Sequence, residues 1–139
     1  MLATGNTPTS GFTLIEALCV VAITALISTI AFPRLQSAIA AQEFRAASSR
    51  VELGLGETRA SAIRTGAPGR FLITHDGASF VAPGRAEQQL PDAVRLHQKG
   101  EIIFYSDGTS AGGEVSLTGK NMRTRFTIFP TTGLISAAR

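Results

Sequence analysis

One uninterrupted apolar segment near the N-terminus constrains this chain more than any other feature. It reads FTLIEALCVVAITALISTIAFP from Phe12 to Pro33, and Glu16 is the one charged side chain before Arg34. As an α-helix the segment would be about 33 Å long at about 1.5 Å per residue. That length matches a hydrocarbon core of about 30 Å. We therefore predict a membrane-spanning helix, followed by a soluble part of modest size.

The position of the segment argues against an ordinary secretory signal peptide. Such a signal has a basic region before its apolar run and a small-residue cleavage site after it. Here no Lys or Arg precedes the run, and the small residue, Gly11, lies before it. An ordinary membrane anchor explains the length but not Glu16, because a carboxylate at the bilayer centre costs about 2.5–3.5 kcal/mol. Glu16 is then either a functional residue or one that lies at the headgroup level.

The same features, taken together, resemble the N-terminal segment of type IV pilins and type II secretion pseudopilins. The shared features are a polar leader (residues 1–11), the pair Gly11-Phe12, Glu16, and an apolar run with a proline at Pro33. The resemblance implies that a prepilin peptidase cuts after Gly11. It also implies that Phe12 becomes the N-methylated first residue and that Glu16 acts in filament assembly.

A physical argument supports an assembly role for Glu16. Cleavage would give Phe12 an α-amine, and the Glu16 carboxylate of one subunit could pair with the Phe12 amine of a neighbour. In a low-dielectric environment an unpaired charge is costly, and pairing recovers much of that cost. Such a pair would set the axial register of an incoming subunit.

The helix is expected to continue past Pro33 as a soluble segment, residues 34–65. Apolar or small side chains recur there three or four residues apart, or at multiples of that spacing, which is typical of a helix with one packed face. They are Leu35, Ile39, Ala47, Val51, Leu55 and Ala62. Gly54 and Gly56 are expected to weaken the helix. The run Thr65-Gly66-Ala67-Pro68-Gly69 is expected to end it.

Residues 66–139 have the pattern of an antiparallel β domain. Asp76-Gly77 lies between the runs Arg70–Thr74 and Ser79–Ala82, which predicts a hairpin. A loose stretch, 83–91, follows. Further strand-like runs are Val94–Leu96, Glu101–Tyr105, Glu114–Thr118, Arg125–Phe129 and Leu134–Ser136. The predicted fold class is α+β and pilin-like, with a long N-terminal helix packed on a C-terminal antiparallel sheet.

The C-terminal half carries a second resemblance. The segments IIFYSDGTSAGGEVSLTG (102–119) and RFTIFPTTGLI (125–135) are similar to the end of minor pseudopilin H of type II secretion and of FimT-like minor pilins. In both, a strand leads into an Asp-Gly turn, a glycine-containing loop, another strand and a closing strand with Thr-Gly. This favours the H-like branch over major pilins.

Nothing in the chain predicts an enzyme, a cofactor or a metal site. His75 and His97 are far apart in sequence, without Cys or acid at metal-ligand spacing. Ser106-Asp107-Gly108 is better explained as a turn than as a nucleophile site, and Asp107 has only Glu114 nearby as a second acid for a cation. The single cysteine, Cys19, cannot form an internal disulfide.

Two functions agree with these features. The first is a minor pseudopilin of the type II secretion system, anchored once in the bacterial inner membrane with its C-terminal domain in the periplasm. Its expected partners are the prepilin peptidase, other major and minor pseudopilins, the inner-membrane secretion platform and membrane lipid. The second is a FimT-like minor pilin of a type IV pilus, involved in pilus assembly or DNA uptake. In DNA uptake Arg123, Arg125 and Arg139 would contact phosphate. Gly133–Ser136 stands where DNA-binding members carry a Gly-Arg motif, so nucleic acid is not the expected partner.

Overall fold

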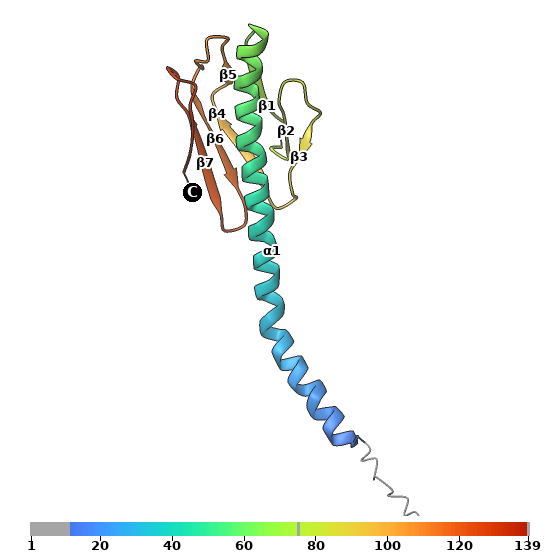
Figure 1. Ribbon diagram of the computed structural model, residues 1–139. Helices are drawn as coiled ribbons and strands as arrows, with labels where there is room; N and C mark the ends of the chain where they lie inside the picture. Colours follow the sequence, from blue (N-terminus) through green and yellow to red (C-terminus); the bar gives the residue numbers. More distant parts are fainter. Residues whose placement is uncertain (1–11, 75, 139) are drawn as a thin grey trace, which may run out of the picture. The chain divides into compact units, whose positions relative to one another are not determined.

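The computed structural model describes residues 12–74 and 76–138, which contain one α-helix and eight β-strands (Figure 1). The helix, α1, is Leu14–Thr65. The strands are β1 Gly69–Ile73, β2 Ser79–Val81, β3 Gln88–Gln89, β4 Arg95–Lys99, β5 Ile102–Phe104, β6 Gly113–Thr118, β7 Arg123–Ile128 and β8 Ile135–Ala138. The predicted α+β class, a long N-terminal helix with antiparallel strands after it, is confirmed.

Helix α1 is continuous through Pro33, as the sequence predicts. It begins two residues after the expected Phe12, because the hydroxyl of Thr13 accepts a hydrogen bond from the Glu16 N–H at 3.3 Å and caps the first turn. It ends at Thr65. Gly66 follows with φ 69°, a left-handed conformation that favours glycine, and its N–H donates to the Ala62 carbonyl at 3.1 Å.

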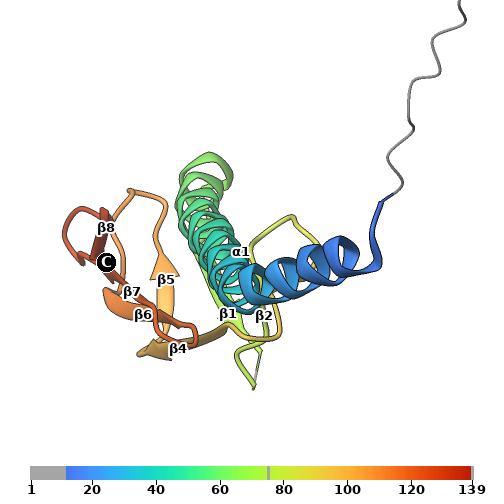
Figure 2. The same ribbon diagram turned by 90° about the horizontal axis from the view of Figure 1, so that it is seen from below.

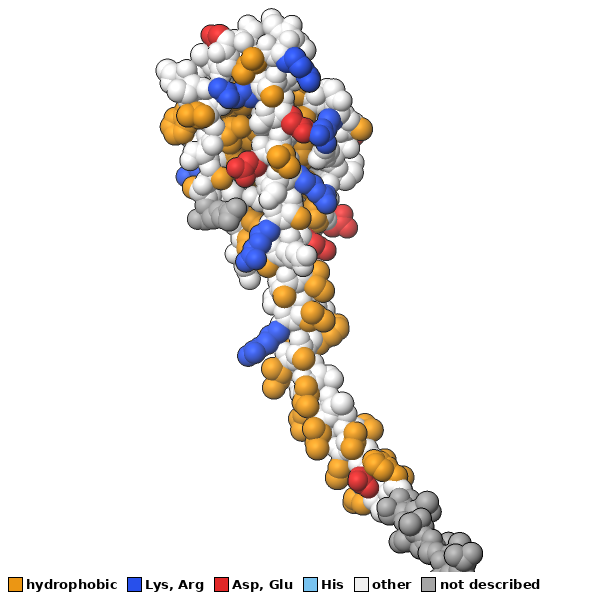
Figure 3. Space-filling model, in the orientation of Figure 1, with side chains coloured by type: hydrophobic (Ala, Val, Ile, Leu, Met, Phe, Trp, Pro, Cys, Tyr) orange, Lys and Arg blue, Asp and Glu red, His pale blue; other side chains and the backbone are white. Residues whose placement is uncertain are grey.

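The first part of α1 belongs to a unit of its own, which ends at Ile39. Its large apolar side chains are exposed, from Phe12 (71%) and Leu14 (82%) to Leu35 (59%) and Ile39 (50%). Orange side chains accordingly cover this part of the helix in Figure 3. An apolar surface of this size and continuity requires lipid or other helices to cover it.

The second unit begins at Ala40 and combines the rest of α1 with two four-stranded antiparallel sheets. Their strand orders are β3-β2-β1-β5 and β4-β6-β7-β8. Figure 1 shows β4, β6 and β7 on one side of this helix segment and β2 and β3 on the other, and Figure 2 shows the same unit from its lower end. The predicted Asp76-Gly77 hairpin is confirmed, with Leu72 opposite Val81 in β1 and β2.

Two strand predictions need correction. The sequence pattern predicts no strand between Pro83 and Pro91, but β3 forms there because Gln88 pairs with Phe80 of β2. Val94 does not begin a strand: its N–H closes a turn onto the Pro91 carbonyl at 2.9 Å. Strand β4 instead starts at Arg95 and runs to Lys99, because β6 offers a partner to every residue of it.

The core of the second unit lies between α1 and the sheets. Four phenylalanines at most 1% exposed, from four strands, fill it together with Val51 and Leu55 of the helix. They are Phe71, Phe80, Phe104 and Phe126. The rings of Phe71 and Phe80 stack with centroids 5.1 Å apart.

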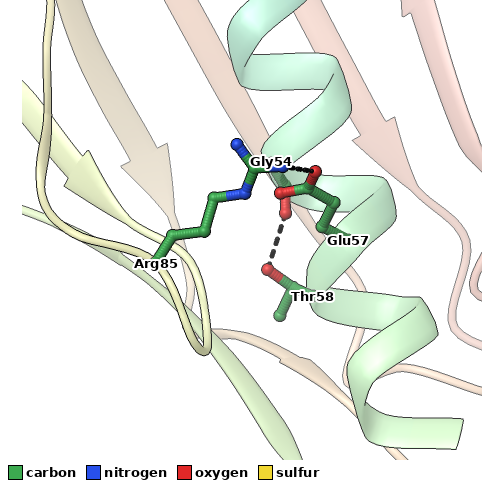
Figure 4. A network of polar contacts seen from close by, with 4 residues as sticks. All are labelled: Gly54, Glu57, Thr58 and Arg85. Atoms are coloured by element: carbon green, nitrogen blue, oxygen red, sulfur yellow. Dashed lines mark hydrogen bonds and ion pairs between the residues drawn. The ribbon is translucent and has the colours of Figure 1, made fainter. Parts of the chain in front are cut away.

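Gly54 is part of this packing. A Cβ atom on Gly54 would lie 2.7 Å from Cε2 of Phe80 and 3.2 Å from Cε2 of Phe71, so only glycine lets α1 approach these rings. Its carbonyl accepts a hydrogen bond from the buried Thr58 hydroxyl at 2.7 Å (Figure 4). One turn of helix further, Glu57 forms an ion pair with Arg85 of the β2–β3 connection, which ties that loop to the helix.

Candidate functional site

The predicted assembly residues fall at the start of α1. Gly11, the residue before the predicted cleavage, lies outside the described residues, whereas Phe12 and Glu16 are described. Phe12 and Glu16 are both exposed, and Glu16 is the acidic residue of the first helical turn. Cleavage after Gly11 and methylation of Phe12 stay predictions.

Thr13 and Glu16 occupy the N-cap and N3 positions of α1. The Thr13 hydroxyl accepts a hydrogen bond from the N–H of Glu16, and the spacing Thr-x-x-Glu is the sequence signature of a capping box. A carboxylate in the first turn is also favoured by the positive end of the helix dipole. Thr13 was not singled out from the sequence, although its spacing to Glu16 carried the signal. The cap fixes Glu16 on the turn that follows Phe12.

The hydroxyl side chains within the apolar segment bond to the helix itself. Thr24 donates to the Val20 carbonyl, Ser28 to the Thr24 carbonyl at 2.7 Å, and Thr29 to the Leu26 carbonyl at 2.7 Å. In hydrocarbon each polar group needs an internal partner, so these bonds suit the segment to a bilayer. By length and composition α1 can cross a membrane, and its apolar window has no residue buried within the chain.

The Ser106-Asp107-Gly108 segment is a turn, as the sequence predicts. The Asp107 carboxylate accepts hydrogen bonds from the Thr109 hydroxyl at 2.6 Å and the Thr109 N–H at 3.0 Å. These two bonds lower the pKa of Asp107 below its ordinary value. Within residues 12–74 and 76–138, no three His, Cys, Asp or Glu side chains gather where they could hold a metal ion.

Arg59 of α1 holds two C-terminal turns. Its Nε donates to the Gly108 carbonyl at 3.1 Å, and its Nη2 donates to the Thr132 carbonyl at 3.1 Å. Gly133 lies beneath this guanidinium with φ 58°, and a Cβ there would be 2.2 Å from the Gly108 carbonyl oxygen. Arg59 therefore donates hydrogen bonds to both the Asp-Gly turn and the Thr-Gly turn. The sequence analysis did not predict this role of Arg59.

The predicted basic residues are only partly brought together. Arg123 and Arg125 point to the same exposed face of β7, while Arg139 lies outside the described residues. Arg125 forms an ion pair with Glu114 of β6 at 3.1 Å, so part of its charge is compensated. Strand β4 adds Arg95 and Lys99 to this face through β6, which the sequence did not predict because the strand order was unknown.

Comparisons with known proteins agree with this geometry. Residues 7–32 match the family model described as the prokaryotic N-terminal methylation motif. Among solved structures, the minor pseudopilin EpsH from the Type 2 Secretion System of Vibrio cholerae is similar, with a TM-score of 0.51 and 15% identity. That likeness covers 71% of this chain and 95% of EpsH, and it shows the fold.

The N-terminal segment and the fold together define a pilin-like protein. The sequence relation is more specific. The chain is 34% identical over 134 residues to type II secretion system protein H of Xanthomonas campestris pv. campestris, covering 88% of this chain and 79% of that protein. The chain belongs to the type II secretion system protein H family, and it is a minor pseudopilin of type II secretion. The resemblance to the H-like branch is thereby confirmed.

Proposed function

We propose that this minor pseudopilin is cut after Gly11, anchored once in the bacterial inner membrane by residues 12–33, and drawn into a periplasmic filament by its first helical turn. Its C-terminal domain, residues 66–139, would lie in the periplasm. The prepilin peptidase, other pseudopilins and the inner-membrane secretion platform would be its partners. The observation that carries the proposal is the exposed carboxylate of Glu16 at the start of an exposed apolar helix.

The chemistry of the pairing follows from charge and dielectric. Cleavage leaves an α-amine on Phe12, four residues before Glu16. Within one chain the first helical turn already uses Glu16 as the N3 residue of its cap. In a filament the carboxylate of an incoming subunit meets the amine of a subunit already in place. Each charge alone would be costly in hydrocarbon, and the pair is much less so.

A second contact is expected further along α1. In the second unit, the helix face turned away from the sheets carries Ser49, Leu53, Gly56 and Ala60, which line a shallow groove together with Glu52 and Glu57. Leu53 is 65% exposed and lies beside these small residues. Small residues let helix backbones approach closely, as Gly-x-x-x-Ala spacing does in helix pairs. We expect this face to pack on the helix of a neighbouring pseudopilin.

Replacement of Glu16 tests the proposal. Glu16→Ala and the neutral isostere Glu16→Gln are expressed in the host at native level, with Glu43→Ala as the matched control. Glu43 is an exposed glutamate of the same helix. Both Glu16 variants are expected to be cleaved and membrane-bound but absent from the filament fraction, while Glu43→Ala incorporates normally. Normal incorporation of Glu16→Ala would refute the pairing.

The processing step has its own measurement. The intact mass of the chain purified from host membranes is expected to equal residues 12–139 plus one methyl group. A mass that retains residues 1–11 in the filament fraction would contradict cleavage after Gly11. A mass equal to residues 12–139 without the methyl group would contradict the predicted methylation but not the predicted cleavage.

A further inference from the structure

A groove lies between α1 and the start of β7 in the second unit. Its volume is about 600 Å³, which is in the range of pockets that take a small molecule. The helix lines one wall, and the residues that follow the β6–β7 turn line the other. Two arginines, two hydroxyl side chains and two apolar side chains meet there: Arg45, Arg123, Ser48, Thr124, Phe44 and Met122. We call this hollow the α1–β7 groove.

The α1–β7 groove lies at the end of the second unit where the chain enters from the apolar segment. Phe44 follows closely on Ala40, at which this unit begins. The ring of Phe44 is in contact with the β6–β7 turn, since a Cβ on Gly119 would be 2.8 Å from its Cδ2. Figure 1 shows this turn beside α1 at the lower end of the sheet. Both walls of the groove therefore belong to the end of the unit that follows the membrane segment in the chain.

The two arginines bring uncompensated charge to the groove. Among the residues that the structure describes, neither Arg45 nor Arg123 forms an ion pair, and no acidic side chain lines the groove. Glu43, the nearest acid in the helix sequence, is exposed and is not part of the lining. Lys120 precedes the lining residue Asn121 and adds a further cation nearby. The planar fork of a guanidinium suits the oxygens of a phosphate group, so the charges match a phosphate anion.

Ser48 and Thr124 supply hydroxyl groups inside the groove. Ser48 is 6% exposed and Thr124 is 2% exposed, and both line the groove. In the part of the chain that the structure describes, neither hydroxyl forms a hydrogen bond, and every fully enclosed side-chain nitrogen or oxygen has one. Both hydroxyls therefore open onto the groove, where each is free to donate to an oxygen of a bound anion. These are buried polar groups that lack a partner within the described chain.

The apolar side chains of the groove indicate which phosphate compound fits. Phe44 and the partly buried Met122 lie in the same lining as the arginines. An inorganic phosphate ion gains nothing from such neighbours. A phospholipid carries glycerol and acyl carbons next to its phosphodiester, and these carbons gain from apolar contact. The mixed lining therefore favours an anionic phospholipid.

Two larger polyanions fit the groove less well. Duplex DNA gains its affinity from several phosphate contacts made at once. A groove between one helix and one hairpin has room for a single phosphate. The carboxylates on the surface of a folded protein stand on a convex face, and the hydroxyls of Ser48 and Thr124 lie within the groove, away from such a face.

Chain spacing brings the groove to the level of a membrane surface. Exposed apolar side chains continue past Pro33, with Leu35 59% exposed and Ile39 50% exposed. Arg45 follows Ile39 by six residues (45 minus 39), which is about 9 Å of helix at about 1.5 Å per residue. The polar layer of a bilayer extends about 5–8 Å beyond each side of its hydrocarbon core. A long helix fits the bilayer by tilting, and arginine extends its charge toward the headgroups. Arg45 is thus at headgroup level when the apolar face through Ile39 lies in the membrane.

We propose that the α1–β7 groove binds the headgroup of an anionic phospholipid of the periplasmic leaflet. The two arginines bind the phosphate oxygens, the two hydroxyls donate hydrogen bonds to them, and the apolar side chains contact the adjoining carbons. A bound lipid holds the second unit at the membrane surface until the subunit enters a filament. This inference rests on the proposed function, because it needs the single membrane anchor and a periplasmic C-terminal domain.

Lipid retention by the full chain tests the proposal. The chain is purified from host membranes, delipidated in neutral detergent and mixed with equal amounts of phosphatidylglycerol and phosphatidylcholine. Bound lipids are counted by native mass spectrometry. The groove variant is Arg45→Gln with Arg123→Gln. The matched control, Arg50→Gln with Lys99→Gln, also removes one exposed cation from α1 and one from a strand, and neither residue lines the groove.

The native chain and the control are each expected to retain one phosphatidylglycerol, about tenfold in preference to phosphatidylcholine. The groove variant is expected to bind phosphatidylglycerol about tenfold more weakly, because the charged contacts to phosphate are lost. Equal retention of the two lipids by the native chain would overturn the proposal. Unchanged phosphatidylglycerol retention by the groove variant would also overturn it.

A variant of unchanged charge separates a built site from general attraction between cations and lipid. Ser48→Ala with Thr124→Val keeps both arginines and removes the two hydroxyls. It is expected to bind phosphatidylglycerol about threefold more weakly, with an unchanged circular dichroism spectrum. Binding as tight as that of the native chain would show that charge alone acts, and would contradict the groove as the site.

Other anions and the membrane anchor are tested on the same preparations. Inorganic phosphate and duplex DNA are each added to the chain without lipid, and neither is expected to bind as tightly as phosphatidylglycerol. Tighter binding of either would assign the groove to that anion and refute the lipid. Alkaline extraction of host membranes tests the anchor: a native chain released by it would contradict the proposed function. A chain that stays embedded but retains no phosphatidylglycerol would contradict this inference alone.

Discussion

Gly54 of α1 and Phe80 of β2 are in such close contact that a methyl group on Gly54 would lie 2.7 Å from the Phe80 ring. Gly56, two residues on, has no atom within 4 Å of the same position. We predict that Gly54→Ala destabilises the chain by about 1–3 kcal/mol through overpacking, in spite of its better helix propensity. Gly56→Ala is expected to stabilise it by about 0.5–1 kcal/mol.

The comparison is made by denaturant unfolding of the mature chain in detergent, followed by near-ultraviolet circular dichroism of the second unit. Equal effects of the two substitutions would show that helix propensity, rather than contact with Phe80, governs both positions.

Gly56→Ala is also expected to leave the fold intact while filling the groove beside Leu53. It is therefore expected to reduce filament incorporation if a neighbouring helix packs there.

Arg59 is predicted to be the main polar tie between α1 and the C-terminal turns. Arg59→Ala removes its bonds to the Gly108 and Thr132 carbonyls and is expected to lower the free energy of unfolding by about 1–3 kcal/mol. Hydrogen exchange is expected to rise in residues 105–110 and 129–134. Arg50→Ala, at an exposed site of the same helix, is the control and should stay within about 0.5 kcal/mol of the native chain. Unchanged exchange in both turns would contradict this role.

The Asp107 turn gives a pH prediction with a defined sign. Hydrogen bonds from Thr109 lower the pKa of Asp107 below its ordinary value of 3.8. A carboxyl group whose pKa is lower in the folded chain stabilises the fold above 3.8, and this contribution is lost as pH falls through the lowered value. In Thr109→Ala the Asp107 pKa is expected to rise toward 3.8, which carbon-detected NMR titration would measure. An unchanged pKa in that variant would mean that the remaining backbone N–H carries the effect.

Thr13 and Glu16 can be separated by mutation. Thr13→Ala removes the cap hydroxyl and is expected to fray the first turn at a cost of about 1 kcal/mol, while the carboxylate stays available. Filament incorporation of Thr13→Ala is therefore expected to fall much less than that of Glu16→Ala. Equal losses would assign Glu16 to the helix cap and would leave no reason to invoke pairing with Phe12.

The sequence predicted those parts of the fold that depend on local signals. The apolar length from Phe12 to Pro33, the Gly66 stop and the Asp76-Gly77 hairpin each depend on neighbouring residues, and the structure agrees with them. Strand β3 was missed because its two glutamines carry no alternation and form a strand only through Phe80. No local pattern specified that partner.

The candidate surfaces could be predicted from the sequence only where they did not depend on pairing between strands far apart in the chain. Arg123 and Arg125 could be placed on one strand from their spacing. Arg95 and Lys99 could not be added without the β4–β6 pairing. For the same reason Gly54 was expected only to weaken α1, since the ring of Phe80 that requires it comes from a strand 26 positions later in the sequence (80 minus 54).

Deletion of the gene in its host, with complementation by the native chain or by Glu16→Ala, tests the function most directly. Secreted enzymes in the medium, twitching and DNA uptake are measured in parallel. We predict that the deletion abolishes secretion, that the native chain restores it and Glu16→Ala does not, and that twitching and DNA uptake are unchanged. Intact secretion with loss of DNA uptake or twitching would contradict a role in type II secretion and would make the chain a minor pilin.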